Sequence, residues 1–194
     1  PLIRNDLIKF IEFAKKIGVL DIYFSTNGLL LNEEISKKLI LSGLTRIQIS
    51  IDATTQETYD KVRPGGDYNK IVKNVNNFIK LRENLNNNLP LVRVNFVKTE
   101  LNHKELNDFI NLWKDKVDMI GIQEFVKPTK VTKEITGKRQ KRDKKFKCSF
   151  PFKQLVINNE RKVLPCCTFW GEELELNEIN RPEDLLKAWN SDKM

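Results

Sequence analysis

The chain has 194 residues, 40% hydrophobic and 31% charged, a balance that suits one ordinary folded domain or one domain with a small appendage. No run approaches the roughly 18 apolar positions of a membrane-spanning helix, and no signal-peptide core is visible, so we expect neither a membrane nor a secreted protein. The net charge of +8 comes from residues 127–147, because the rest of the chain holds 24 basic and 24 acidic residues.

The spacing of apolar residues, together with residues that cap or end helices, predicts alternating helices and strands in the first two thirds of the chain. Asn32 and Thr55 are expected to cap helices, Gly18 to end one, and Asn102 with Glu105 to form a capping box. In chain order the expected elements are a helix at 4–17, a strand at 21–26, a helix at 33–42, a strand at 46–51, helices at 55–62 and 68–84, a strand at 91–97, a helix at 102–116 and a strand at 119–126.

This alternation predicts an α/β fold in which helices cover parallel strands. Four strands and five helical segments, with a helix at the very start, look like part of a (β/α) barrel rather than a whole one. No Gly-x-Gly-x-x-Gly and no P-loop sequence occurs, which gives a dinucleotide-binding fold or a nucleoside triphosphatase little support. We therefore expect a partial barrel core over residues 1–126.

Residues 127–147 contain ten Lys or Arg and two Asp or Glu. A nucleic-acid-binding surface is expected to interleave aromatic residues with basic ones, whereas here Phe146 stands alone near the end. We interpret the segment as a solvated basic linker at a domain boundary and do not expect nucleic-acid binding. Docking of an acidic peptide or another anionic partner is the alternative.

The remaining residues, 148–194, predict a small second domain. Segments 154–158 and 162–166 read as a β-hairpin, and a short terminal helix follows, with Pro182 near its first turn and Leu185, Leu186 and Trp189 on one side.

All three cysteines, Cys148, Cys166 and Cys167, lie in this tail. An odd count with two adjacent thiols argues against a secreted disulfide framework and for a reducing, cytoplasmic location. Thiols gathered beside Pro and aromatic residues are typical of soft ligands for a metal or iron–sulfur cluster, although a closed site needs four. Three buried or free thiols are the alternative reading.

In a parallel β/α barrel, functional side chains collect at the carboxyl ends of the strands. Ser50 and Asp52 alternate on one predicted strand and should point to the same side, where a hydroxyl and a carboxylate suit the hydroxyl groups of a ribose. The alternative is that Asp52 caps the following turn. Other residues at predicted strand ends are Thr26, Asn27, Gly28, Asn95, Lys98, Gln123 and Glu124.

Two side chains are set apart from this group. Lys98 is either a Schiff-base nucleophile or a solvated lysine, and His103, the one histidine, is expected at the surface.

Together these segments resemble a radical S-adenosylmethionine enzyme with a SPASM-type auxiliary iron–sulfur domain, and the resemblance covers nearly the whole chain. Thr26-Asn27-Gly28 resembles the motif of that family's third strand, and Ile49-Ser50-Ile51-Asp52 resembles its fourth. Glu57 to Arg63, followed by a Gly pair, resembles the loop after the fourth strand. The tail, from Cys148 through Pro165-Cys166-Cys167 to Trp189-Asn190, is similar to the start of a SPASM domain.

The resemblance implies the cofactors S-adenosylmethionine and [4Fe–4S] clusters. It implies that Ser50 and Asp52 hold the cofactor, with Thr26, Asn27, Asn95 and Arg63 as further contacts, and that Cys148, Cys166 and Cys167 ligate an auxiliary cluster. It also implies a reductant such as flavodoxin or ferredoxin. The full-length enzyme would form a 5′-deoxyadenosyl radical and abstract hydrogen from a peptide or a small metabolite, and the residues do not decide between these substrates.

Three departures from the family pattern are visible. The Cys-x3-Cys-x2-Cys segment and the Gly-Glu pair do not occur, and Arg161 stands where the hairpin usually has Gly. Since the chain also starts without Met, we expect an internal fragment that is inactive and poorly stable by itself. Two alternatives stay open: a non-catalytic, degenerate barrel with a metal-stabilised interaction module, and a different β/α enzyme that uses Lys98 and a zinc-binding tail.

Overall fold

The computed structural model describes residues 1–125, 148–167 and 174–192. These residues form two compact units, one before and one after the basic segment. The predicted linker at 127–147 lies outside the described residues. We describe each unit by itself.

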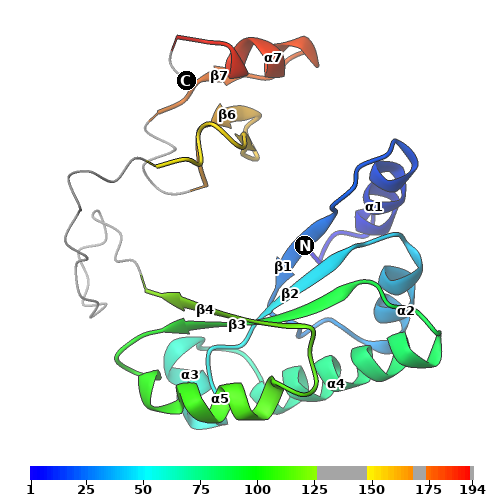
Figure 1. Ribbon diagram of the computed structural model, residues 1–194, viewed down its shortest axis with the longest axis vertical. Coiled ribbons are helices and arrows are strands. Elements are labelled where there is room, and N and C mark those ends of the chain that lie inside the picture. Colours follow the sequence, from blue (N-terminus) through cyan, green and yellow to red (C-terminus); the bar gives the residue numbers. More distant parts are fainter. Residues whose placement is uncertain (126–147, 168–173, 193–194) are drawn as a thin grey trace. The chain divides into compact units, whose positions relative to one another are not determined.

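The first unit is built on a four-stranded parallel sheet (Figure 1). Its strands stand in the order β1-β2-β3-β4, so each strand pairs with the next one along the chain. The α/β class and the partial (β/α) barrel are confirmed, and the four described strands do not close on themselves. The strands are β1 (Tyr23–Thr26), β2 (Arg46–Ser50), β3 (Leu91–Lys98) and β4 (Met119–Glu124).

The core lies between one face of this sheet and the helices beneath it (Figure 1). Ile47 and Ile49 alternate with partly exposed residues along β2, which shows that only one face of the strand is covered. Fully buried Ile71 and Phe78 of α4 belong to the same core. The helices are α1 (Leu7–Lys16), α2 (Glu33–Leu41), α3 (Gln56–Val62), α4 (Tyr68–Asn84) and α5 (Leu106–Trp113), with a 3-10 turn, η1 (His103–Glu105), before α5.

Two predicted helix caps are confirmed and one is wrong. Asn32 and Thr55 accept hydrogen bonds from backbone N–H groups in the first turns of α2 and α3. The capping box at Asn102 and Glu105 does not form, because both side chains turn towards neighbouring loops, and α5 starts only at Leu106.

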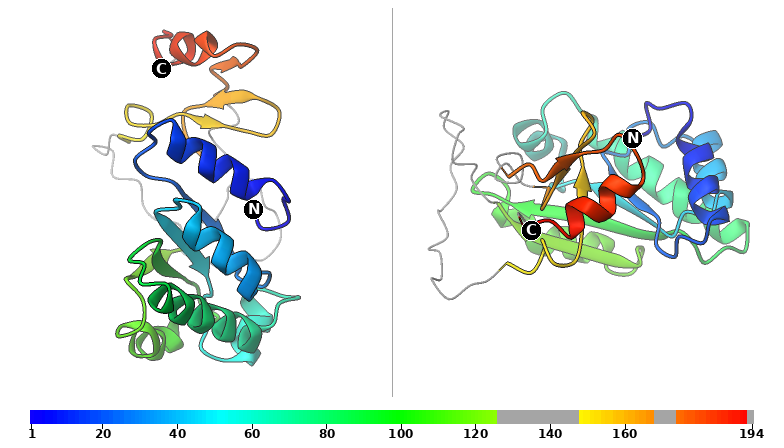
Figure 2. Two further views of the ribbon diagram at one scale, coloured as in Figure 1. Left: turned by 90° about the vertical axis from the view of Figure 1, so that its right-hand side faces the viewer. Right: turned by 90° about the horizontal axis from the view of Figure 1, so that it is seen from above.

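The second unit is a small antiparallel sheet with one helix, seen from two further directions in Figure 2. β5 (Val156–Ile157) and β6 (Lys162–Leu164) form the predicted hairpin, and β7 (Asn177–Glu178) adds a strand that the sequence analysis missed. α7 (Glu183–Trp189) packs Ala188 against Val163 and Leu176.

One detail of this helix contradicts the sequence analysis. Leu186 is 68% exposed, so the predicted apolar side is wrong at this position, and Leu185 and Ala188 make the contact instead.

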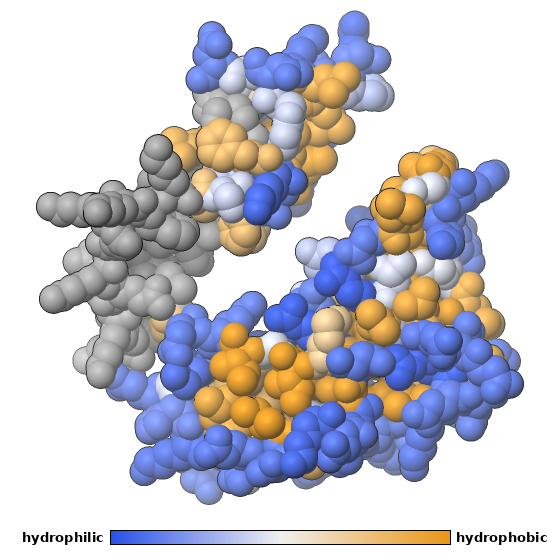
Figure 3. Space-filling view, in the orientation of Figure 1, coloured by the Kyte–Doolittle hydropathy of each residue, from blue (hydrophilic) through white to orange (hydrophobic). Residues whose placement is uncertain are grey.

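Apolar side chains reach the surface around α1 and the loop that follows it (Figure 3). Phe10, Phe13 and Ile17 of this region are each more than half exposed, and Leu20 is 91% exposed. Among the described residues, no helix combines the length and the apolar character needed to cross a membrane.

Candidate functional site at the carboxyl edge of the sheet

The carboxyl ends of β2 and β3 meet at one edge of the sheet. Ser50 and Asn95 pair in register, so their side chains lie beside each other on the face that the helices do not cover. Asn95 is 7% exposed, its Oδ1 is buried without a hydrogen-bond partner, and Ser50 has no side-chain hydrogen bond among the described residues. Two polar groups at this edge therefore lack a hydrogen-bond partner among the described residues.

Asp52 lies just beyond the end of β2 and is engaged within the chain. Its Oδ1 accepts a hydrogen bond from the Val97 N–H (2.7 Å), and its Oδ2 accepts one from Arg63 Nε (2.6 Å). The strand ends at Ser50 and the φ of Asp52 is +63°, so the predicted alternation of Ser50 and Asp52 on one side is not preserved. The Asp52 side chain does not cap the following turn either, because its carboxylate bonds to β3 and to the end of α3.

Arg63 ends α3 and pairs with Asp52 instead of projecting from the edge. Its guanidinium lies 2.6 Å from the Asp52 carboxylate, and its backbone N–H donates to the Tyr59 carbonyl. The pair ties the loop after β2 to the end of α3.

The Thr26-Asn27-Gly28 segment forms a tight turn after β1. The Thr26 hydroxyl accepts from the Gly28 N–H and Asn27 Oδ1 accepts from the Leu29 N–H. Gly28 has φ +76°, and a Cβ there would press on Ile49 at 3.2 Å, which is why the turn requires glycine. Thr26 pairs with Ile49 and shares its helix-covered face, so its side chain does not lie beside Ser50.

The open face of the sheet carries a row of polar side chains that the sequence analysis missed. Ser25, Gln48 and Arg93 pair across β1, β2 and β3, one layer below Ser50 and Asn95. Gln48 Oε1 accepts hydrogen bonds from Ser25 Oγ and from Asn95 Nδ2, each at 3.5 Å. The signal was present in the sequence, because polar residues alternate with Ile47, Ile49, Val92 and Val94 along both strands.

Glu105 joins the loops that follow β2 and β3. Its carboxylate accepts hydrogen bonds from the Thr54 N–H (2.6 Å), the Thr54 hydroxyl (2.8 Å), the Thr55 hydroxyl (3.1 Å) and the Thr58 hydroxyl. Burial acts to raise the pKa of Glu105, but these hydrogen bonds outweigh it and hold the pKa below its ordinary value.

Asn102 reinforces the same junction. Its Nδ2 donates to the carbonyls of Asp52 (2.8 Å) and Val97 (2.9 Å), while its Oδ1 accepts from the Thr99 N–H (2.7 Å). Since Asn102 is 1% exposed, one buried amide satisfies backbone groups of both loops.

Three other predicted strand-end residues and the histidine lie at the surface or in an ion pair, with no sign of a catalytic arrangement. Lys98 and Glu124 form an ion pair across β3 and β4, which gives no support to a Schiff-base role for Lys98. Gln123, also on β4, is exposed. His103 is exposed as predicted, and its Nδ1 lies 2.9 Å from the Glu100 carbonyl oxygen.

The three cysteines lie in the second unit without a disulfide. Cys148 and Cys167 are exposed and Cys166 is partly exposed. Within the residues that the structure describes, no group of three or more His, Cys, Asp or Glu side chains gathers as a metal site. Their role as cluster ligands stays a prediction.

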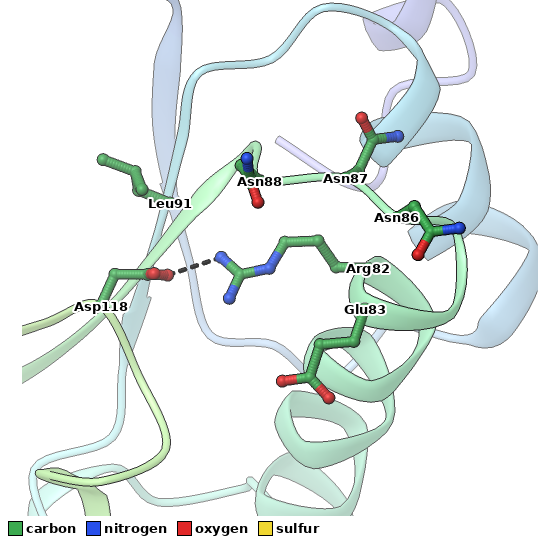
Figure 4. Close-up of a pocket in the computed structure, with 7 residues that line it drawn as sticks. All are labelled: Arg82, Glu83, Asn86, Asn87, Asn88, Leu91 and Asp118. Atoms are coloured by element: carbon green, nitrogen blue, oxygen red, sulfur yellow. Dashed lines mark hydrogen bonds and ion pairs between the residues drawn. The ribbon is translucent and has the colours of Figure 1, made fainter.

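A polar pocket of about 480 Å³ lies at the opposite, amino-terminal edge of the sheet (Figure 4). Arg82 extends from α4 and donates to Asp118 (2.6 Å) and to the Pro90 carbonyl (2.9 Å). Asp118 also accepts from the Val92 N–H (2.7 Å). These bonds join α4 to the starts of β3 and β4, and the pocket is lined by Arg82, Glu83, Asn86, Asn87, Asn88, Leu91 and Asp118.

Several curated proteins are similar in sequence to this chain. It is 32% identical over 126 residues to a probable GTP 3′,8-cyclase of Methanocaldococcus jannaschii, covering 65% of the chain and 40% of the relative. It is 36% identical over 118 residues to a GTP 3′,8-cyclase of Alkaliphilus oremlandii, covering 60% of this chain and 35% of that relative. A probable GTP 3′,8-cyclase of Saccharolobus islandicus is 27% identical over 161 residues, covering 71% and 50%. The matched part thus spans half or less of each relative.

A solved structure and a family model complete the comparison. The crystal structure of Streptococcus suis SuiB matches with a TM-score of 0.69 and 16% identity, covering 97% of this chain and 53% of SuiB, which shows a shared fold. The family model described as Radical SAM superfamily matches residues 1–100, more than half of the chain. The chain therefore belongs to the Radical SAM superfamily.

Proposed function

We propose that this chain supplies part of the S-adenosylmethionine site of a radical SAM enzyme. The observation that carries the proposal is the adjacent pair Ser50 and Asn95, which lies within the family match and has side-chain polar groups without a partner among the described residues at the carboxyl edge of the sheet. In this family S-adenosylmethionine and a [4Fe–4S] cluster supply a 5′-deoxyadenosyl radical that abstracts hydrogen. No Cys-x3-Cys-x2-Cys occurs in these 194 residues, so we assign cofactor binding, not cleavage, to them.

Ser50 and Asn95 fit a ribose or a methionine group. The Ser50 hydroxyl both donates and accepts, and the buried Asn95 Oδ1 needs a donor such as a ribose hydroxyl. The other four residues predicted to contact the cofactor would instead shape the backbone around the site in this proposal. Asp52 and Arg63 fix the loop after β2, while Thr26 and Asn27 form the turn after β1.

For the substrate, we infer a small metabolite in preference to a peptide. The relatives named GTP 3′,8-cyclase support a small anionic molecule, and the basic segment at 127–147 has the charge to attract one. SuiB is similar only in fold and does not bear on the substrate.

The second unit would be a SPASM-like domain in this proposal, with Cys148, Cys166 and Cys167 as ligands of an auxiliary cluster. The described thiols do not gather, so we derive no step of the reaction through that cluster. A reductant such as flavodoxin or ferredoxin would be the electron-donating partner. Anaerobic reconstitution with iron and sulfide tests the tail, because replacing all three cysteines with serine should abolish iron and sulfide uptake.

Equilibrium dialysis with labelled S-adenosylmethionine tests the cofactor site. We expect the chain to bind it, and we expect Ser50→Ala and Asn95→Ala each to weaken binding about tenfold, the effect of one well-placed hydrogen bond. Ser42→Ala is the matched control, because Ser42 is a buried serine that donates to the Leu39 carbonyl away from this edge. Unchanged affinity in both site variants, or no binding by the parent chain, would contradict the proposal.

A further inference from the structure

The first unit leaves both edges of its parallel sheet unpaired. Strands β2 and β3 each pair on both sides, whereas β1 and β4 each pair on one side only within the described residues. β1 has the sequence Tyr-Phe-Ser-Thr, without the charged residues or proline that commonly protect a sheet edge. The unpaired backbone N–H and C=O groups of such an edge favour pairing with a further strand.

Helix α1 presents an apolar surface beside the β1 edge. A helix that connects two adjacent parallel strands covers both of them, but α1 leads into β1 without an earlier described strand to cover. Only Ile11 of α1 is buried, while Phe10, Phe13 and Ile17 recur on one side of the helix and are each more than half exposed. We call these three residues, together with Leu20, the α1 patch (Figure 3).

The other edge, β4, has an apolar side chain that no described helix covers. Ile120 packs against the core, and Ile122 lies two residues further on the same, helix-covered face but is 47% exposed. Gly121, between them, pairs with Asn95 and belongs to the open face. Among the described residues, β4 thus lacks a helix over its outer side, and α1 lacks a second strand beneath its patch.

Two copies of the first unit satisfy both edges at once. The unit contains four consecutive parallel strands, each preceded by a helix. Eight parallel strands surrounded by helices are the number that closes a (β/α) barrel. About a two-fold axis along the barrel, β4 of each copy pairs in parallel with β1 of the other, and each α1 patch covers Ile122 at that junction. A second copy is the occupant that supplies the missing strand and the missing helix together.

The apolar area also fits a second copy. The four side chains of the α1 patch expose on the order of 500 Å², and the paired strand edges add to this, which approaches the ~800 Å² per partner of a standard stable interface. The polar open face, with Gln48 and Arg93, then lines the enclosed space. Both copies of the Ser50 and Asn95 pair come to lie at one rim of the barrel.

We propose that the chain forms a homodimer in which two four-stranded half-barrels close into one eight-stranded barrel through two β4–β1 junctions. Each junction is covered by an α1 patch. The inference concerns assembly and goes beyond the proposed function. The dimer forms whether or not S-adenosylmethionine binds, so the two proposals fail separately.

Sedimentation equilibrium of the full chain over a concentration series is the first measurement. We expect a species of twice the 22.7 kDa chain mass. Phe10→Glu and Ile122→Lys each place a charge in both junctions, and each should weaken dimerisation about a hundredfold, roughly tenfold per junction. Leu41→Glu is the matched control, because Leu41 is a 61% exposed apolar residue at the end of α2, which connects two strands of the same copy. It should dimerise as the parent chain does.

An equimolar mixture of Phe10→Glu and Ile122→Lys separates this arrangement from other forms of self-association. In a mixed dimer one junction is unaltered and the other brings opposite charges together, so the mixture should regain a dimer that neither variant forms alone. Direct pairing of two β1 edges would leave Ile122→Lys unaffected. The proposal is overturned by a parent chain that stays monomeric, as it would if a different polypeptide covered these edges. A dimer that tolerates either variant, a mixture that stays monomeric, or a loss of the dimer in Leu41→Glu also overturns it.

Discussion

Replacing Asp52 with asparagine separates an architectural role from direct cofactor contact. The carboxylate is 7% exposed and accepts from the Val97 N–H and from Arg63. Asparagine keeps one acceptor for Val97 but presents a donor to Arg63. The substitution therefore removes one charge-assisted hydrogen bond at nearly constant volume and leaves the backbone of the turn intact, since asparagine tolerates the φ of +63°.

The expected loss of stability is about 2 kcal/mol. A hydrogen bond to a charged group contributes about 1.5–3 kcal/mol, and water recovers part of it at the Arg63 side chain, which is 31% exposed. For a unit of this size the Tm should fall by roughly 8 °C. Arg63→Met should cost a similar amount, about 2 kcal/mol, because it leaves the buried carboxylate without its cation.

Urea unfolding of Asp52→Asn, Arg63→Met and the double variant measures the coupling between the two side chains. The double variant should lose clearly less than the sum of the single losses. Lys61→Met is the control, since Lys61 lies in the same helix and forms only an exposed pair with Glu57, and it should not change the midpoint measurably. Additive losses, or an Asp52→Asn variant with parental stability and weakened cofactor binding, would refute the architectural role.

Three further outcomes are expected. Glu105 has a lowered pKa in the folded state, so its contribution to stability is present above its unfolded pKa and is lost as pH falls through the folded value. The urea midpoint should therefore fall less for Glu105→Gln than for the parent when the pH is lowered from 7 to below the unfolded pKa of the carboxyl group. Asp118→Asn should lower the free energy of unfolding by about 2–3 kcal/mol, because it leaves the 10%-exposed Arg82 unpaired, and chemical denaturation would show it. Arg161→Gly should stabilise the second unit by about 0.5–1 kcal/mol, since Arg161 has φ +64°, and a lower Tm would contradict this.

The fold was largely predictable because each element has its own local signal. The 17-residue helix α4 occupies residues 68–84 as predicted, since its apolar stripe and the Asp67 cap define both pattern and start. The parallel strands followed from short apolar runs between helices. β7 was missed because a two-residue strand carries no periodicity, and it forms only by pairing with β6.

The sequence predicted where the candidate site lies in the fold, but it did not predict which side chains bond to one another there. Strand ends located Ser50 and Asn95 correctly at one edge. The engagement of Asp52 by Val97 and Arg63 could not be predicted, because it depends on where β2 stops and on a residue 45 positions away. Asn102 and Glu105 fit a local capping pattern. In the structure their side chains bond instead to Asp52 and Thr54 in the loop after β2, which the local sequence could not predict.

The bonds made by Asn102 and Glu105 have a dynamic consequence. Because these two side chains join the loops after β2 and β3, neither loop can open without breaking the bonds to the other. The two segments should behave as one cooperative opening unit, in which the amide hydrogens of Thr54 and Thr99 exchange with similar opening free energies. A ligand that contacts either loop would then slow exchange in both.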